Sequence, residues 1–319
     1  MEPPFAVICL AGPSADETRR LNDLLESLFF WEPRTPLVLL VDDPRAGRDL
    51  AAAAPAPPEG RLIVMPNPLA GVGHYWDRGC AGMAAGLAHL SRIPGIEFVL
   101  KVDTDSLVVA PFSERVAGAI RRNPAAGQIG AYTAGSRGER WYSRGWLHPM
   151  GRLSLPVRAW RKPAFPGFWL ESALRGRARR VRAYACAARA QGYRAGEHIL
   201  GGGNVISPTA LSRMADRGLL DEPRFWRGRM VVEDLLLSMY VRAVGLELLD
   251  DSGEGGVFGV AGRGLPHAPL EILRRRHAVV HSVKNDPKFP EEGVLAFFRE
   301  RRGNPSRPHL GCWDTAEGR

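Results

Sequence analysis

Apolar runs alternate with segments of helical spacing through the first third of the chain, and this alternation constrains the fold more than any other feature. The runs, which are typical of strands buried on both faces of a parallel sheet, are Phe5–Leu10, Pro36–Val41, Leu62–Met65 and Ile96–Val102. Between them, Asp16–Phe30 and Trp76–Leu90 carry apolar residues at helical spacing. The order predicts an α/β fold, in which an open twisted sheet is flanked by helices on both faces.

The character of the sequence changes after this first part. Residues 1–134 hold the alternating pattern, and residues 135–194 form a basic, aromatic-rich insertion with one helix expected near its end. Residues 195–290 hold a glycine cluster and an expected helix over Val231–Val244, with Gly245 well placed to end it. Residues 291–319 form a tail with one short helix. We expect a single large domain.

Composition narrows the class of protein. The chain has 319 residues, of which 45% are apolar and 24% charged, as in ordinary globular proteins. Its cysteines are far apart, without the paired spacing of a zinc ribbon or a disulfide scaffold, and the N-terminal apolar run is too short to span a bilayer. We therefore expect a cytoplasmic protein. A net charge of +9 favours anionic partners such as nucleotides or lipid headgroups.

An Asp-Thr-Asp motif follows the fourth apolar run. In an extended segment residues i and i+2 point to the same side, so Asp103 and Asp105 can converge on one hard cation. The alternative to a metal site is an ordinary surface turn without a function, because this tripeptide is common. Ligands of open α/β sheets bind beyond the carboxyl ends of the strands, and the position of the motif at such an end favours a functional role.

Three further groups could take part in chemistry. Glu233 and Asp234 open a predicted helix, where acidic residues are favoured by the helix dipole but can equally act as a general base. The glycines 201–203 either make a simple turn or let the backbone approach a sugar or phosphate. His281 follows an apolar run and could bind a transition metal, and Lys284 could pair with a phosphate.

The order of these pieces resembles the inverting GT-A glycosyltransferases, closest to the β1,3-galactosyltransferase and Fringe-like group. The resemblance rests on WDRGCAGMAAGLAHL and EFVLKVDTDSLVV around the metal motif, then on LGGGNVISPTAL and VVEDLLLSMYVRAVGLELLDD. With the stretches that join them, these segments cover about half of the chain. The resemblance implies the GT-A fold, a Rossmann-like open mixed sheet, with Mn²⁺ or Mg²⁺ as cofactor and a nucleotide sugar, foremost a UDP-sugar, as donor.

The resemblance also implies a role for each matched position. Asp105 and His281 would bind the metal, and Asp103 would contact the metal through water or the ribose. Asp234 would be the catalytic base, with Glu233 as the second candidate. Ala11, Gly12 and Asp43 would line the base and ribose pocket, and Arg78 would face the diphosphate. Gly202, Gly203 and Lys284 are further candidates for contact with the donor, on the chemistry given above.

The sequence departs from this family in several ways and leaves rival functions open. The motif reads DTD rather than DDD or DDT, and the disulfides and membrane anchor of the family have no counterpart. A retaining GT-A transferase would share the same metal groups. A nucleotidyltransferase is a further alternative, although AGPSADETRR does not supply its usual phosphate loop.

The insertion has no recognised match, so the acceptor could be a glycan, a lipid-linked molecule or another hydroxyl compound. Its arginines, Arg175, Arg177, Arg179, Arg180 and Arg182, could instead bind an anionic polymer or an anionic membrane without catalysis. Within the enzyme interpretation they would hold the protein at the inner face of the membrane. We expect no nucleic-acid partner for the enzyme.

Overall fold

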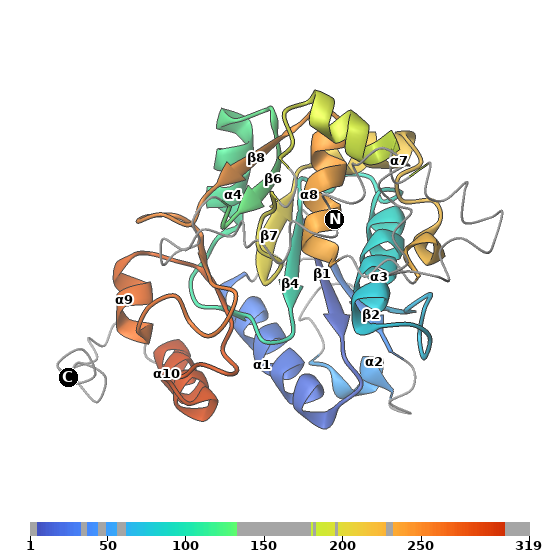
Figure 1. The fold of residues 1–319 in the computed structure, drawn as a ribbon. Coiled ribbons are helices and arrows are strands. Elements are labelled where there is room, and N and C mark those ends of the chain that lie inside the picture. Colours follow the sequence, from blue (N-terminus) through green and yellow to red (C-terminus); the bar gives the residue numbers. More distant parts are fainter. Residues whose placement is uncertain are drawn as a thin grey trace.

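The computed structural model describes residues 5–32, 37–43, 49–55, 62–132, 180, 183–194, 197–227 and 232–303. These residues form a seven-stranded sheet in the order β3-β2-β1-β4-β7-β6-β8 and a three-stranded sheet in the order β5-β10-β9 (Figure 1). The strands of the large sheet are β1 (Ala6–Ala11), β2 (Leu37–Asp42), β3 (Leu62–Pro66), β4 (Val99–Asp103), β6 (Ala126–Gly130), β7 (Gly203–Ile206) and β8 (Glu247–Asp250). Those of the small sheet are β5 (Leu107–Val108), β9 (Phe258–Val260) and β10 (Val279–His281).

The large sheet is mixed, as predicted. Strand β1 pairs in parallel with β2 and β4, and β2 pairs in parallel with β3. Strand β7 runs antiparallel to both neighbours, β4 and β6, whereas β6 and β8 are parallel to each other. Among the described strands of this sheet β7 is therefore the reversed one. Its first residue, Gly203, pairs with Val102 near the carboxyl end of β4, so both segments meet at one edge of the sheet.

Helices cover both faces of the sheet (Figure 1). They are α1 (Ala15–Trp31), α2 (Leu50–Ala53), α3 (Tyr75–Leu90), α4 (Ser113–Arg122), α7 (Pro208–Asp216), α8 (Glu233–Ala243), α9 (Pro269–Arg274) and α10 (Glu291–Gly303), with a 3₁₀ turn η4 (Pro223–Trp226). One core joins the sheet to α3, α7 and α8, and a second core joins the opposite face to α1 and α4. These cores keep the ends of the central strands fixed relative to α1, α3 and α8.

The predicted strands and helices of the first third are confirmed within a few residues at each end. The predicted helix over Val231–Val244 is observed as α8, and Gly245 follows it with a φ of 78°, a left-handed conformation that glycine adopts without strain. The connector after residue 50 begins with the one-turn helix α2, which the sequence analysis did not predict. Residues 183–190 are helical, near the end of the insertion as expected, whereas residues 133–179 lie outside the described part of the chain.

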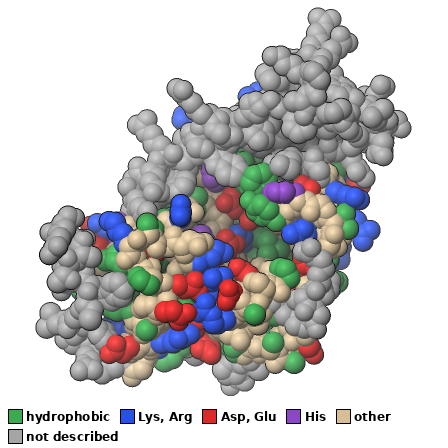
Figure 2. All heavy atoms as spheres, turned by 60° about the horizontal axis from the view of Figure 1, so that its bottom comes forward, with side chains coloured by type: hydrophobic (Ala, Val, Ile, Leu, Met, Phe, Trp, Pro, Cys, Tyr) green, Lys and Arg blue, Asp and Glu red, His purple; other side chains and the backbone are tan. Residues whose placement is uncertain are grey.

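The tail helix α10 is held against α1 by ion pairs. The Arg20 guanidinium donates to both oxygens of Glu291, at 2.9 Å each, and Arg299 donates to Oδ1 of Asp23. Figure 2 shows acidic and basic side chains interleaved on the face that lies below the sheet in Figure 1, where α1 and α10 are drawn. The pairs fix α1, whose first turn carries Glu17 at the candidate site.

None of the described helices is both long enough and apolar enough to cross a membrane.

Candidate active site

A cavity of about 620 Å³ opens at the carboxyl edge of the central strands. Residues from both halves of the chain line it, as expected for an open α/β sheet. The predicted site residues that line the cavity are Ala11, Gly12, Asp43, Arg78, Asp103, Asp105, Glu233, Asp234 and Lys284. The structure therefore brings the acidic motif, the helix-opening carboxylates and the basic residues into one space.

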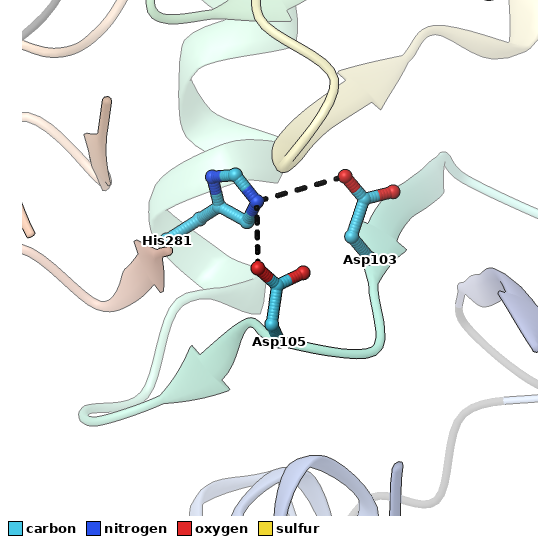
Figure 3. A group of neighbouring side chains, drawn as sticks. All are labelled: Asp103, Asp105 and His281. Carbon is cyan, nitrogen blue, oxygen red and sulfur yellow. Dashed lines mark ion pairs between the residues drawn. The ribbon is translucent and has the colours of Figure 1, made fainter. Parts of the chain in front are cut away.

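Asp103, Asp105 and His281 form a compact cluster (Figure 3), and of the three the two aspartates belong to the lining of this cavity. The imidazole Nε2 of His281 lies 3.4 Å from Oδ2 of Asp105 and 3.7 Å from Oδ2 of Asp103. The pairing of two short strands brings His281 to the two aspartates. Val280 of β10 is in register with Leu107 of β5, and β5 begins two residues after Asp105. The predicted grouping of these three side chains is thus present in the fold.

The cluster suits a divalent cation. One ligand atom from each of the three residues lies within 4.8 Å of the others, and carboxylate oxygen with imidazole nitrogen is a donor set that Mn²⁺ accepts. Nδ1 of His281 is 3.1 Å from the carbonyl oxygen of Ala261, a contact in which the ring donates and leaves Nε2 facing the carboxylates. The residues present therefore fit a metal site.

Asp105 is held in its ionised form. The Ser282 hydroxyl donates to Oδ2 of Asp105 at 2.5 Å, and the Lys284 ammonium lies 3.4 Å from the same oxygen. Burial raises the pKa of Asp105, but His281, Lys284 and Ser282 outweigh burial and hold the pKa well below its ordinary value. Asp105 is 2% exposed, so its charge needs these partners or a cation.

Glu233 and Asp234 occupy the first turn of α8 and face the same cavity. Burial, with help from Asp234, raises the pKa of Glu233 to about 7. Burial also raises the pKa of Asp234, against the opposing charge of Lys101. Oδ1 of Asp234 is buried against Gly201, whose backbone lowers the pKa of this carboxyl. A carboxylate at the start of a helix that lines a cavity can serve as a general base.

The glycines between residues 200 and 204 make room for these groups. A Cβ on Gly201 would collide with Asp234, and one on Gly202 would collide with the ring of His281. Gly203 begins β7 and is not part of a turn before it, and a Cβ there would lie 3.0 Å from Val279. Gly202 and Gly203 are absent from the described lining of the cavity, so their contact with a donor stays a prediction.

The other end of the cavity is formed by the ends of β1 and β2 and by the start of α3. Ala11 and Gly12 line it together with Asp43, and Arg78 lies 3.7 Å from Asp43. Several lining residues were not among those predicted from the sequence, namely Glu17, Asn67, Tyr75, Trp76 and His198. Glu17 was recognisable in principle as an acidic residue in the first turn of the helix after β1. The other four had no pattern that separated them from ordinary loop and helix residues.

Comparison with known proteins adds matches among solved structures only. No family model and no curated protein matches the chain. The apo structure of the WbbM bifunctional glycosyltransferase aligns with 95% of this chain at 11% identity and a TM-score of 0.48, and this chain spans 50% of it. An active-site mutant of LgtC aligns with 96% of this chain and 98% of its own, at 12% identity and a TM-score of 0.47.

A third structure is the mannosyltransferase PcManGT from Pyrobaculum calidifontis, in complex with GDP-Man and Mn²⁺. It aligns with 95% of this chain and 70% of its own, at 15% identity and a TM-score of 0.38. At these values the function has to be argued from the residues of this chain.

Proposed function

We propose that this chain is a metal-dependent glycosyltransferase, which moves a sugar from a nucleotide-diphosphate sugar to an acceptor hydroxyl with inversion. One observation carries the proposal: Asp103 and Asp105, whose carboxylates face His281, line the same cavity as the carboxylates at the start of α8. Such a transfer needs both parts, because a diphosphate must leave while a hydroxyl loses its proton.

The donor would lie across the strand ends. Ala11, Gly12 and Asp43 would receive the nucleoside, and the cationic side chains of Arg78 and Lys284 would face the diphosphate. Mn²⁺ or Mg²⁺ would be held by Asp103, Asp105 and His281, and when bound it would neutralise charge on the leaving diphosphate. We propose a UDP-sugar as donor.

Asp234 would be the base. We prefer it to Glu233, because the carboxylate of Glu233 lies 3.7 Å from the Lys101 ammonium. The acceptor hydroxyl would donate to the Asp234 carboxylate and attack from the side opposite the diphosphate, so that the sugar inverts. A retaining transferase would use the same cation cluster, and the anomeric form of the product distinguishes the two.

A glycan acceptor would fit the wall next to α8. Tyr75 and Trp76 line the cavity one turn before Gly79, and a Cβ on Gly79 would lie 2.9 Å from Glu233. The Tyr75 ring is 58% exposed. Aromatic rings beside a catalytic carboxylate can stack on the apolar face of a sugar, which supports a saccharide acceptor.

One of the five arginines predicted to contact a membrane is instead engaged within the protein. Arg180 lies 2.9 Å from Glu222, and its guanidinium stands over the ring of Phe225, so this side chain is used within the protein. The other four arginines lie outside the described residues. Salt-sensitive sedimentation with anionic liposomes would test the membrane contact and the expected cytoplasmic, peripheral location.

The decisive experiment has two stages. UDP-, GDP- and dTDP-sugars are first tested with Mn²⁺ for thermal stabilisation of the protein and for slow donor hydrolysis, and we expect a response to one nucleotide class. Asp234→Asn should then keep the stabilisation by donor but lose transfer, whereas Asp216→Asn, in the exposed last turn of α7, should change neither. No response to any nucleotide would refute the proposal, and near-normal turnover of Asp234→Asn would refute the base.

A further inference from the structure

Lys101 is a buried lysine in the middle of β4. It is 1% exposed, although its strand is otherwise apolar up to Asp103. Alternation along the strand puts Val99, Lys101 and Asp103 on one face, and Val99 packs in the core that contains α3 and α8. Lys101 therefore points from the sheet towards the first turn of α8.

The ammonium of Lys101 joins three parts of the candidate site. It donates to Oδ1 of Asp103 at 2.6 Å and to the carbonyl oxygen of Gly201 at 2.5 Å. It also lies 3.7 Å from Oε1 of Glu233. A buried ammonium needs such partners, because burying an unpaired charge is strongly unfavourable.

These contacts have a consequence for the cation cluster. Lys101 occupies Oδ1 of Asp103, whereas Oδ2 of the same carboxylate faces the imidazole of His281. The bond to Gly201 also fixes the turn on which Asp234 and His281 pack. One side chain thus orients the metal-facing carboxylate and holds the turn beneath the proposed base.

We propose that Lys101 is a positioning residue, which limits Asp103 to one metal-facing oxygen and sets the distance between that carboxylate and the carboxylates of α8. The catalytic half of this proposal rests on the proposed function, whereas the metal half does not. A positive charge next to a metal-facing carboxylate also weakens cation binding. Lys101 therefore lowers the affinity for the metal while it fixes the geometry of the site.

The test uses Lys101→Met, which keeps the length of the side chain, and Lys101→Gln, which keeps a donor for Gly201 but has no charge. Lys288→Met, at an exposed position, removes the same charge from the chain and serves as the control. Binding of Mn²⁺ without nucleotide is measured by electron paramagnetic resonance, together with the melting temperature and, where transfer is observed, kcat and the donor KM.

We expect both Lys101 variants to bind Mn²⁺ about tenfold more tightly, since the competing charge is gone. We also expect kcat to fall at least tenfold with little change in donor KM, because the base and the cation cluster are no longer held in register. Replacing a lysine that only filled space in the core, without its charge acting on Asp103, would leave Mn²⁺ binding unchanged. Unchanged or weaker Mn²⁺ binding in a folded variant would overturn the proposal.

The two proposals fail in different ways. Because Mn²⁺ binding needs no donor, tighter binding in the Lys101 variants supports the positioning role even if no sugar nucleotide is ever used. If Lys101→Met does not fold, Lys101→Gln serves in its place, because the same tighter Mn²⁺ binding and lower kcat are expected for it. If transfer is observed and a folded Lys101 variant keeps the wild-type kcat, the catalytic half of the proposal is wrong.

Discussion

Replacing Gly202 by alanine should damage the cation cluster without touching any of its ligands. The added Cβ would collide with the ring of His281. Gly202 does not have a positive φ, so alanine is acceptable to the backbone and the effect comes from the collision alone. The turn has little freedom to retreat, because Ser106 donates to the carbonyl oxygen of Gly202 and Lys101 to that of Gly201. The imidazole therefore has to move.

The size of the effect follows from the cost of overpacking a buried site, about 1–3 kcal/mol. If the ring leaves its position to relieve this strain, the same free energy is lost from metal binding. At about 1.4 kcal/mol for each tenfold change, we expect Mn²⁺ affinity to fall about 5- to 150-fold.

Metal binding is measured by titrating Mn²⁺ without nucleotide. Gly118→Ala in α4 is the matched control, since its Cβ would meet only the flexible guanidinium groups of Arg121 and Arg122. A double-mutant cycle with His281→Ala isolates the cause. In that background the ring is absent, so Gly202→Ala should produce no additional loss of affinity. Equal losses in both backgrounds, or wild-type affinity in a folded Gly202→Ala protein, would refute the role of His281.

Two further predictions concern stability. His277 is 1% exposed, and burial lowers its pKa to about 4. Between pH 6.5 and pH 4 the unfolded chain therefore binds more protons than the folded protein. The free energy of unfolding consequently decreases as the pH is lowered through this window. Between pH 7 and pH 5 this difference removes about 2 kcal/mol from the free energy of unfolding, and urea titrations of His277→Gln should lack that contribution. Glu32 accepts from the backbone N–H groups of Phe112 and Ser113 and from the Ser113 hydroxyl, at the start of α4. Glu32→Ala should lower the free energy of unfolding by about 2–4 kcal/mol, whereas Glu26→Ala, at a 55% exposed side chain, should change it by less than about 1 kcal/mol.

Much of the sheet was predictable, because β1 and β2 are apolar almost throughout and parallel neighbours bury both of their faces. The place of Asp103 and Asp105 at a ligand site followed from the rule that ligands bind at strand ends, whereas the role of the α8 carboxylates at that site was assigned through the family resemblance. His281 was a possible metal ligand from the sequence alone, but its place beside Asp103 and Asp105 was expected only through the family resemblance. Its physical reason, the pairing of β10 with the two-residue strand β5, is too short a signal to recognise in a sequence.

Other features escaped because their causes lie far away in the chain. Helix α4 begins after Phe112 without a side-chain cap of its own, and its free N–H groups are satisfied by Glu32 at the end of α1. Lys101 looked like an interruption in an apolar strand, because the three groups that justify its burial come from other positions. Local patterns predict elements, whereas these contacts arise only when the elements pack.

The reversed direction of β7 has a consequence for the order in which the site can be made. A ribosome delivers Asp103 and Asp105 about a hundred residues before Gly201 and almost two hundred before His281. A nascent chain that has folded only its first strands would thus present two aspartates with neither the imidazole nor the carboxylates of α8. Insertion of β7 between β4 and β6 is the event that closes the sheet and brings the glycine turn to the strand ends. The proposed activity would then arise late in synthesis, and a nascent chain that ends before His281 would lack it.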